Sequence, residues 1–332
     1  MADVTIIMPT WNKERYVAEA LDSVFRQRTS RAFRILVADD CSTDRSREIV
    51  AAYDRAHPGV ITVLASESNQ KLFRNVRRAY ALTDTPYFCV LDPDDYWTDE
   101  RHLDKAVGFL EAHPEFTIYS AGIERLEPDG RRTDCAFADR ETDSDFDDYL
   151  AGRAVVAFTQ TCVYRNVVFA NGLPAKVKDP PYPSMERTLR GDSFRNFLHL
   201  REGKAHYSPG IEACYRITDE GVYQGVGEFE RKVMNARFFA DMWRYDDERH
   251  VELLACSQRL YALARAEAMR ELARPDLPET KLRALAVEMA DLERLYAEGR
   301  EALDAHLLRT LPFRQRLRYR GYMKLRHKDI VG

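Results

Sequence analysis

Short apolar stretches alternate with helical patterns through the first part of the chain, and every apolar stretch ends in polar side chains. The apolar stretches are expected to be strands at residues 4–10, 33–40, 59–66 and 86–92. Helical spacing of apolar residues fills the intervals at 13–27, 42–53 and 73–82. This alternation predicts an α/β fold with a mostly parallel sheet covered by helices on both faces. Ligands of such sheets bind beyond the carboxyl ends of the strands, so the polar ends mark the expected site.

Two of these strand ends carry clustered carboxylates. The sequence CVLDPDDYW places Asp92, Asp94 and Asp95 directly after a strand, and RILVADD places Asp39 and Asp40 at the end of another. Close carboxylates repel each other, and a divalent cation or a raised pKa relieves the repulsion. Hard oxygen ligands suit Mg²⁺ or Mn²⁺, which often hold a substrate's phosphates as well. The alternative is a solvated turn in which Asp94 or Asp95 caps the next helix.

Composition excludes several classes of protein. A length of 332 residues indicates one large domain with an appendage, or two domains. The net charge of −4 gives no sign of bulk nucleic-acid binding. No apolar run reaches the roughly 18–20 residues of a membrane span, and the start of the chain lacks a secretory signal pattern. The six cysteines form no CxxC pair, so a cytoplasmic protein with reduced thiols is expected.

The middle of the chain is mixed and the end is helical. Two strands around a turn at 128–130, an acidic surface loop at 139–148, no regular structure at 179–184 and a strand–turn–strand at 206–218 are expected. A helix at 251–273 precedes apolar residues in 3/4 spacing at 282–303, with Gly299 in one core position. This pattern predicts an antiparallel helical hairpin that packs on the domain or forms a homo-oligomer.

The last part of the chain is basic. Residues 309–328 hold eight Lys or Arg and no acidic residue, interleaved with aromatic and aliphatic side chains. Such a segment can lie on an anionic membrane surface, which would place the protein peripherally at the inner face of the cell membrane. The alternative is a terminal helix that packs on the acidic body of the same chain. No nucleic-acid partner is expected, because no recognisable nucleic-acid module accompanies the patch.

Three blocks together resemble the family 2 glycosyltransferases of GT-A fold, of the bacterial polysaccharide type. The blocks are VTIIMPTWNKERYVAEALDSVFRQ, ILVADDCSTDRSREIV and NQKLFRNVRRAYALTDTPYFCVLDPDDYW. The resemblance covers residues 4–97 and continues more weakly to about residue 225. It implies a Rossmann-like GT-A domain at 1–228, with a nucleotide-sugar-binding half at 1–97 and an acceptor half at 98–228. An α-helical extension at 229–332 would follow.

The resemblance also implies roles for residues at the strand ends. The nucleotide-sugar-binding positions would be Pro9, Thr10, Asn12, Glu14, Asp40, Asn69, Lys71, Asp92 and Asp95. Asp40 would contact a uracil ring, and Asp94 with Asp92 would bind Mn²⁺ or Mg²⁺. Asp95 would orient the donor sugar or share the metal. Lys71 stands where a glycine is usual, and it either reaches the diphosphate or points outward.

The resemblance places the general base at Asp192, which opens a helix running through Leu200. Glu186 is the competing candidate, and a helix cap is the structural alternative for Asp192. Thr218 stands where many relatives carry a histidine that assists the metal or phosphate, and Asp219 or Tyr223 are its possible substitutes.

The implied reaction is metal-dependent, inverting transfer of a sugar from a UDP-sugar to an acceptor hydroxyl by single displacement. The acceptor would be a saccharide or a lipid-linked saccharide of cell-surface polysaccharide synthesis, and the enzyme a hexosyl- or N-acetylhexosaminyltransferase. A non-catalytic nucleotide-sugar-binding scaffold on the same frame is the alternative. A nucleotidyltransferase is disfavoured, because PTWNKER contains no glycine for a phosphate loop.

Overall fold

The computed structural model describes residues 2–182, 184–188, 191–218, 226–272 and 278–311. The chain divides into two compact units, Met1–Gly221 and Val222–Gly332, called here the sheet unit and the helical unit. Most of the basic segment, residues 312–328, lies outside the described residues, as do Asp219 and Tyr223. No described helix is both long enough and apolar enough to cross a bilayer.

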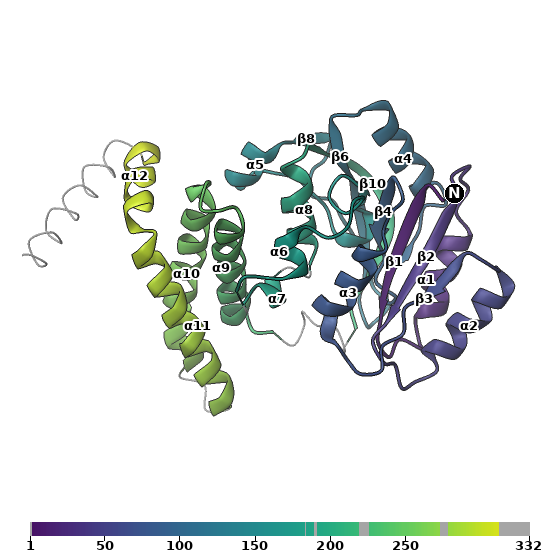
Figure 1. Cartoon of the computed structure of the whole chain (residues 1–332), viewed down its shortest axis with the longest axis horizontal. Coiled ribbons are helices and arrows are strands. Elements are labelled where there is room, and N and C mark those ends of the chain that lie inside the picture. Colours follow the sequence, from purple (N-terminus) through teal and green to yellow (C-terminus); the bar gives the residue numbers. More distant parts are fainter. Residues whose placement is uncertain (1, 183, 189–190, 219–225, 273–277, 312–332) are drawn as a thin grey trace, which may run out of the picture. The chain divides into compact units, whose positions relative to one another are not determined.

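The sheet unit contains strands and helices in alternation (Figure 1). Its strands are β1 (Val4–Thr10), β2 (Phe33–Asp39), β3 (Ile61–Val63), β4 (Tyr87–Val90), β5 (Tyr96–Trp97), β6 (Phe116–Leu126), β7 (Arg132–Cys135), β8 (Thr142–Ser144), β9 (Val163–Arg165) and β10 (Lys204–Arg216). Its helices are α1 (Val17–Phe25), α2 (Ser46–Ala56), α3 (Lys71–Ala81), α4 (His102–Ala112), α5 (Phe146–Leu150), the 3₁₀ turn η1 (Thr159–Thr161), α6 (Ala175–Lys178), α7 (Met185–Thr188) and α8 (Asp192–Leu200).

The sheet is parallel in its first half and mixed beyond it. In the described residues the strand order is β3-β2-β1-β4-β9-β6-β10-β5, with β7 beside β6 and β8 beside β10. The strand β1 pairs in parallel with β2 and β4, and β2 pairs in parallel with β3. The four strands predicted from the apolar stretches are therefore neighbours, and their carboxyl ends meet at one edge. Beyond β4 the sheet becomes mixed, because β9 runs antiparallel to both β4 and β6.

Helices cover both faces of the parallel strands, as the sequence predicts. On one face, Ile6 and Met8 of β1 share a buried core with Leu21 of α1 and Val107 of α4. Successive strand side chains point to opposite faces. On the other face, α3 packs against β1 and β2. With both faces buried, the polar groups that follow the strands are left at the sheet edge.

Two predictions for the middle of the chain are wrong. Residues 206–216 form one strand, β10, because the chain keeps its direction beside β6 and absorbs Pro209 and Gly210 as a shift in register. The acidic stretch 139–148 is not a plain loop, since β8 pairs with β10 and Asp145 caps α5. The turn expected at 128–130 is confirmed between β6 and β7, with Gly130 at φ +84°.

The helical unit contains α9 (Glu228–Tyr245), α10 (Val251–Leu272), α11 (Glu279–Glu298) and α12 (Arg300–Thr310). The helix α10 packs along α9 and also runs antiparallel to α11, where the Ser257 hydroxyl lies 2.7 Å from that of Tyr296. The predicted hairpin is present, although α9 shares its core. Gly299 occupies a core position as predicted, because a Cβ there would lie 2.3 Å from Leu254 and 3.1 Å from Trp243.

Candidate active site

The turn between β4 and β5 carries the three clustered carboxylates and is called here the acid turn (Asp92–Asp95). A strand follows it directly, so the alternative that Asp94 or Asp95 caps a helix is wrong. Asp95 is only 2% exposed, and both of its oxygens accept bonds from the protein. The Gln160 side-chain amide donates to Oδ2, and the Arg216 backbone N–H donates to Oδ1 at 2.8 Å. These bonds to η1 and β10 fix the shape of the turn.

Asp94 faces a lysine from the loop after β1. The Lys13 ammonium lies 2.7 Å from Asp94 Oδ2, and the two side chains are 16% and 18% exposed. The backbone on both sides is also held. The Lys13 N–H donates to Ser46 Oγ at 2.7 Å, and Arg216 Nε donates to the Asp94 carbonyl at 3.1 Å. Sequence patterns gave no sign that this lysine meets the acid turn.

Of the three carboxylates in the acid turn, Asp92 has the fewest partners among the described residues. Within the described part of the chain, no hydrogen bond to its side chain is formed. Burial, followed by the charge of Asp94, raises the pKa of Asp92 to about 6, and Asp192 adds to the rise. Arg195 and Lys13 oppose it. The charge of Asp192, the predicted base, therefore acts on Asp92, as does the charge of Asp94 in the acid turn.

The helix α8 brings Asp192 to the same site. Gly191 is its N-cap, so the structural alternative for Asp192 as the cap is wrong. Among the described residues, the Asp192 carboxylate accepts only local bonds, from the N–H of Ser193 at 2.7 Å and from its hydroxyl at 3.4 Å. One turn further on, the buried Arg195 donates to the Tyr80 hydroxyl at 2.9 Å and so ties α8 to α3. Asp192 keeps a carboxylate oxygen available for a proton.

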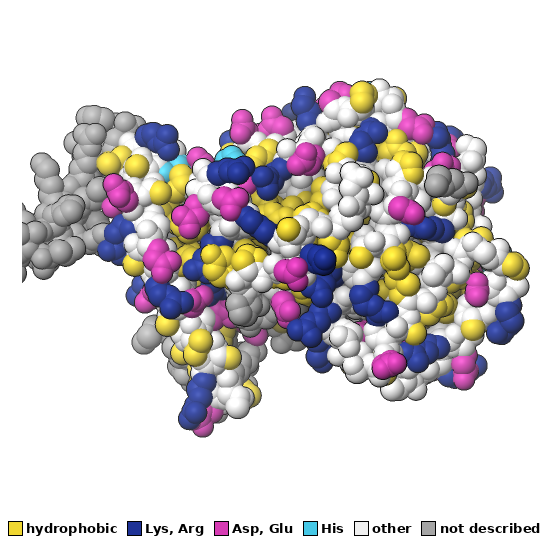
Figure 2. Space-filling view, in the orientation of Figure 1, with side chains coloured by type: hydrophobic (Ala, Val, Ile, Leu, Met, Phe, Trp, Pro, Cys, Tyr) yellow, Lys and Arg dark blue, Asp and Glu magenta, His cyan; other side chains and the backbone are white. Residues whose placement is uncertain are grey.

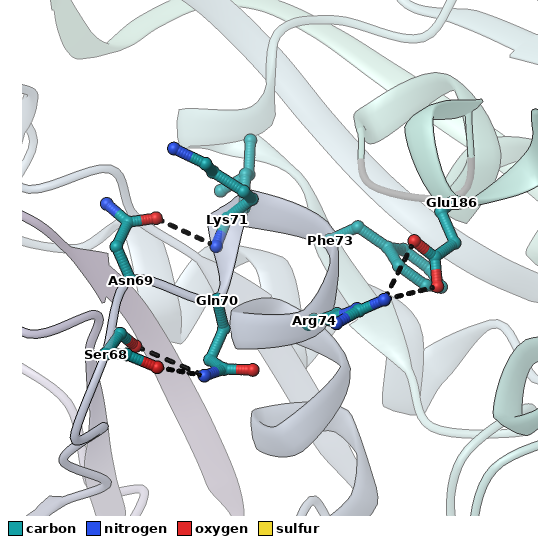
Figure 3. Close-up of a pocket in the computed structure, with 8 residues that line it drawn as sticks. Ser68, Asn69, Gln70, Lys71, Phe73, Arg74 and Glu186 are labelled. Carbon is teal, nitrogen blue, oxygen red and sulfur yellow. Dashed lines mark hydrogen bonds and ion pairs between the residues drawn. The ribbon is translucent and has the colours of Figure 1, made fainter.

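Glu186, the competing base, is already paired. Figure 3 shows its two oxygens facing the guanidinium of Arg74, at 3.2 and 3.3 Å. A carboxylate held through both oxygens by arginine is a weaker candidate for taking up a proton.

The ends of β1 and β2 are joined by hydrogen bonds. The Asp40 N–H donates to the Thr10 carbonyl at 2.8 Å, and Asp40 Oδ1 accepts from the Gln70 N–H at 2.6 Å. Asn12 Oδ1 accepts from the Thr43 N–H at 2.8 Å. Asp40 thus connects three strand ends, and Asn12 connects the first two loops.

Two further predicted residues fit the same pattern. Glu14 accepts from the Arg45 N–H at 2.9 Å, which again links the loop after β1 to the start of α2. Pro9 is the half-buried residue before Thr10 in β1, and Thr10 is buried. The structure therefore gathers the predicted nucleotide residues around one edge, although several of their polar groups are occupied by each other.

Lys71 has a left-handed backbone with φ +68°. Only glycine adopts this conformation without steric cost, which explains why a glycine is usual at this position. The Asn69 side chain accepts from the Lys71 N–H at 3.0 Å and supports the turn. Lys71 and Asn69 line a cavity of about 610 Å³ together with Arg74 and Glu186 (Figure 3).

The surroundings of this cavity are basic. The helix α3 carries four Lys or Arg and no acid, and Arg77 donates to the Lys178 carbonyl at the end of α6 at 2.8 Å. Lys and Arg side chains gather on this face of the sheet unit (Figure 2). The cavity is therefore suited to anionic groups.

Several site residues have no local sequence signal. Lys13 is next to Asn12 in the first block, whereas Gln160, Arg195 and Arg216 come from distant elements. Trp11 is 52% exposed, although tryptophan is usually well buried. Its position directly after β1 leaves a large aromatic surface at the sheet edge.

Thr218 is buried where a metal-assisting histidine is usual, and its Oγ1 has no hydrogen-bond partner among the described residues. Also within the described ranges, no group of three or more His, Cys, Asp or Glu is arranged to hold a metal ion. A divalent cation commonly binds through one or two carboxylates and completes its shell with water and substrate phosphates. Asp92 and Asp94 supply such a pair, and the charge of Asp94, which after burial contributes most to the raised pKa of Asp92, is one that a bound cation would offset. The donor set fits a hard divalent cation that the substrate helps to hold.

The sheet unit therefore combines acids at the carboxyl ends of its parallel strands with a further acid at the start of α8. Residues 5–158 match the family described as glycosyl transferase family 2. Residues 5–158, a little under half of the chain, therefore form a domain of this family, and the GT-A fold agrees with the prediction.

Known proteins similar to this chain support the assignment. An uncharacterized protein of Mycobacterium tuberculosis is 27% identical over 235 residues, which cover 70% of this chain and 64% of that protein. The poly(ribitol-phosphate) beta-N-acetylglucosaminyltransferase TarS of Staphylococcus aureus is 31% identical over 115 residues, 34% of this chain and 20% of that protein.

Solved structures show the same fold. TarS 1-349 in complex with UDP aligns with a TM-score of 0.64 at 18% identity, covering 91% of this chain and 83% of that one. TarS has also been solved with UDP-GlcNAc. A mannosyltransferase of Pyrobaculum calidifontis in complex with GDP-Man and Mn²⁺ aligns with a TM-score of 0.52 at 17% identity, covering 92% and 85%.

Proposed function

We propose that the chain transfers a sugar from a UDP-sugar to an acceptor hydroxyl with inversion at the anomeric carbon. The observation that carries the proposal is that the charge of Asp192 acts on Asp92 of the acid turn, while Asp192 Oδ2 accepts no hydrogen bond from the described residues. A glycosyl transfer of this kind needs charge stabilisation on the leaving diphosphate and a base for the acceptor. The solved complexes with UDP and UDP-GlcNAc support a uridine donor.

The donor would lie along the strand ends. The exposed ring of Trp11 offers a stacking surface for the base, and Asp40, directly after β2, is bonded through its backbone to Thr10, the residue before Trp11. Thr10, Pro9, Asn12 and Glu14 shape this end of the pocket. Asn69 and Lys71 lie at the mouth of the basic cavity, which suits the negative charge of the diphosphate.

Asp94 and Asp92 would hold Mn²⁺ or Mg²⁺. A bound cation would neutralise charge on the diphosphate as the sugar leaves. The Mn²⁺ named for the mannosyltransferase complex supports this part of the proposal. Asp95, held by Gln160 and Arg216, keeps the two other acids in place and would orient the donor sugar.

The chemical step needs one base. Asp192 would take the proton of the acceptor hydroxyl while its oxygen bonds to the anomeric carbon. The bond from that carbon to the diphosphate oxygen breaks on the opposite face, and UDP leaves with the bonding electrons. The configuration therefore inverts.

The transferred sugar would be a hexose or N-acetylhexosamine, and the acceptor a saccharide or lipid-linked saccharide of cell-surface polysaccharide synthesis. A cytoplasmic location with peripheral membrane contact through 309–328 and self-association through the helical unit belong to the same proposal. TarS, named for transfer to poly(ribitol-phosphate), supports a surface-polymer role.

The test is UDP release from candidate UDP-sugars with Mn²⁺ and saccharide acceptors. Asp192→Asn is expected to lower turnover at least about a hundredfold, because base catalysis contributes roughly 10²–10⁴. Asp94→Ala is also expected to lower turnover, because the cation that Asp94 would hold stabilises the leaving diphosphate. Glu186→Gln serves as the matched control and should retain most of the activity. Full turnover in both aspartate variants would refute the assignment.

The second candidate function is a nucleotide-sugar-binding scaffold without turnover. The left-handed Lys71 and the hydrogen bonds that Thr43 donates to the Asn12 side chain favour a rigid binding pocket. UDP-sugar binding without UDP release across a panel of acceptors would support the scaffold instead of the enzyme.

A further inference from the structure

Lys13 forms an ion pair with Asp94, the carboxylate that would bind the metal in the proposed function. The ammonium lies 2.7 Å from Asp94 Oδ2, and both side chains are more than four-fifths buried. A pair this sheltered is screened less than a surface ion pair. Lys13 therefore already supplies Asp94 with a positive charge in the absence of any ligand.

Both partners are held in place by other contacts. The Lys13 N–H is bonded to Ser46 at the start of α2, and the Asp94 carbonyl is bonded to Arg216 at the end of β10. Since the two backbones are fixed by these bonds, forming the pair orders the two side chains but no further backbone. The pair is thus better prepared than an exposed ion pair, which is usually worth little.

A divalent cation at Asp94 would meet this ammonium at close range. Two positive charges a few ångströms apart in a largely buried site repel strongly.

We propose that Lys13 is a built-in counter-ion of Asp94 that a divalent cation has to displace, with the donor diphosphate taking up the released ammonium. This inference rests on the proposed function. It makes metal and nucleotide binding cooperative, because each is favoured once the other is present. Lys13 acts as a positioning residue, since it works through Asp94 and the diphosphate.

The test measures Mn²⁺ affinity in the absence of nucleotide, by the electron paramagnetic resonance signal of free Mn²⁺, on the metal-stripped full chain. Lys13→Met is expected to bind Mn²⁺ about tenfold more tightly than the wild type, because a neighbouring opposite charge shifts a carboxylate by roughly one to three pKa units. Lys13→Arg keeps the charge and should behave like the wild type. Equal or weaker Mn²⁺ binding in Lys13→Met overturns the inference.

Lys105→Met is the matched control. Lys105 is also an ion-paired lysine of the sheet unit, 3.2 Å from Glu212 and bonded to Asp99, but it does not contact the acid turn. Its replacement should leave Mn²⁺ affinity unchanged. A tenfold gain there would show that any lost lysine charge tightens binding, which contradicts a specific role of Lys13.

The cooperativity supplies a second readout. UDP is expected to raise Mn²⁺ affinity more in the wild type than in Lys13→Met, where no ammonium has to be moved. Equal enhancement in the two proteins overturns the inference.

The variant Asp94→Asn distinguishes a failure of the proposed metal site from a failure of the role proposed for Lys13. If it binds Mn²⁺ as tightly as the wild type, the metal part of the proposed function fails and the role of Lys13 fails with it. If it loses Mn²⁺ while Lys13→Met shows no gain, only the role of Lys13 is overturned.

Discussion

Replacing Asp92 by asparagine is expected to stabilise the metal-free sheet unit at neutral pH. Asp92 lies beside Asp94 and within reach of Asp192, and its pKa is raised from 3.8 to about 6 by burial and these charges. For an acid with a raised pKa, the folded state is favoured while the group is protonated. That contribution is present at low pH and is lost as the pH rises through about 6. Asparagine keeps the shape of the neutral carboxyl and removes the loss.

The magnitude follows from the shift. One pKa unit corresponds to about 1.4 kcal/mol, so a difference of about two units amounts to roughly 3 kcal/mol at full ionisation. The gain in free energy of unfolding from Asp92→Asn should be about 1 kcal/mol near pH 4.5 and about 3 kcal/mol near pH 7.5. This gain in the free energy of unfolding grows as the pH rises from the unfolded pKa of 3.8 to the folded pKa of about 6.

The assay is urea unfolding in the presence of a chelator, followed by tryptophan emission. The chain has three tryptophans, Trp11 and Trp97 in the sheet unit and Trp243 in the helical unit. A Trp243→Phe background therefore makes the signal report on the sheet unit alone. Wild type and Asp92→Asn are compared in this background at both pH values.

Asp134→Asn is the control, because Asp134 is an exposed residue of β7. Exposed substitutions of this kind usually change stability by less than about 0.5 kcal/mol. If Asp92→Asn does not raise the free energy of unfolding, or if the gain does not grow with pH, Asp92 is not a buried carboxylate close to other negative charges.

Three further predictions concern single positions. Lys71→Gly should raise the free energy of unfolding by about 0.5–1 kcal/mol in urea titrations, since φ +68° strains lysine but not glycine; a loss would show that the ammonium makes a stabilising contact. Gly299→Ala should lower the midpoint temperature of thermal unfolding, followed by Trp243 emission, by several degrees, because its Cβ would lie 2.3 Å from Leu254. An unchanged midpoint would mean that the helical unit makes room for the added methyl group. Trp11→Ala should weaken UDP binding about tenfold by calorimetry, the size of one base–aromatic stack, and unchanged affinity would place the base elsewhere.

The parallel half of the fold could be predicted because its signals are local. Apolar runs and helical spacing locate β1, β2, β3 and β4 within a few residues, and parallel pairing brings their polar ends together. The bond from the Asp40 N–H to the Thr10 carbonyl shows the result directly. The position of the candidate site at this edge of the sheet could therefore be predicted from the sequence.

The remaining features depend on contacts between distant segments. Gln160 and Arg216 bind Asp95 from 65 and 121 residues away, and nothing in their neighbourhood indicates this role. The sequence around Pro209 and Gly210 has turn residues, yet pairing with β6 keeps β10 continuous. Tertiary pairing overrides local turn preference there.

A crystal structure of the full chain with UDP and Mn²⁺ tests the proposed donor site most directly, because anomalous diffraction locates the metal independently of the protein. The expected result is Mn²⁺ bonded to Asp94 and to the diphosphate, with the uracil beside Asp40 and the Lys13 ammonium moved from Asp94 to a phosphate oxygen. Mn²⁺ bound away from the acid turn, or UDP bound away from the ends of β1 and β2, would contradict it.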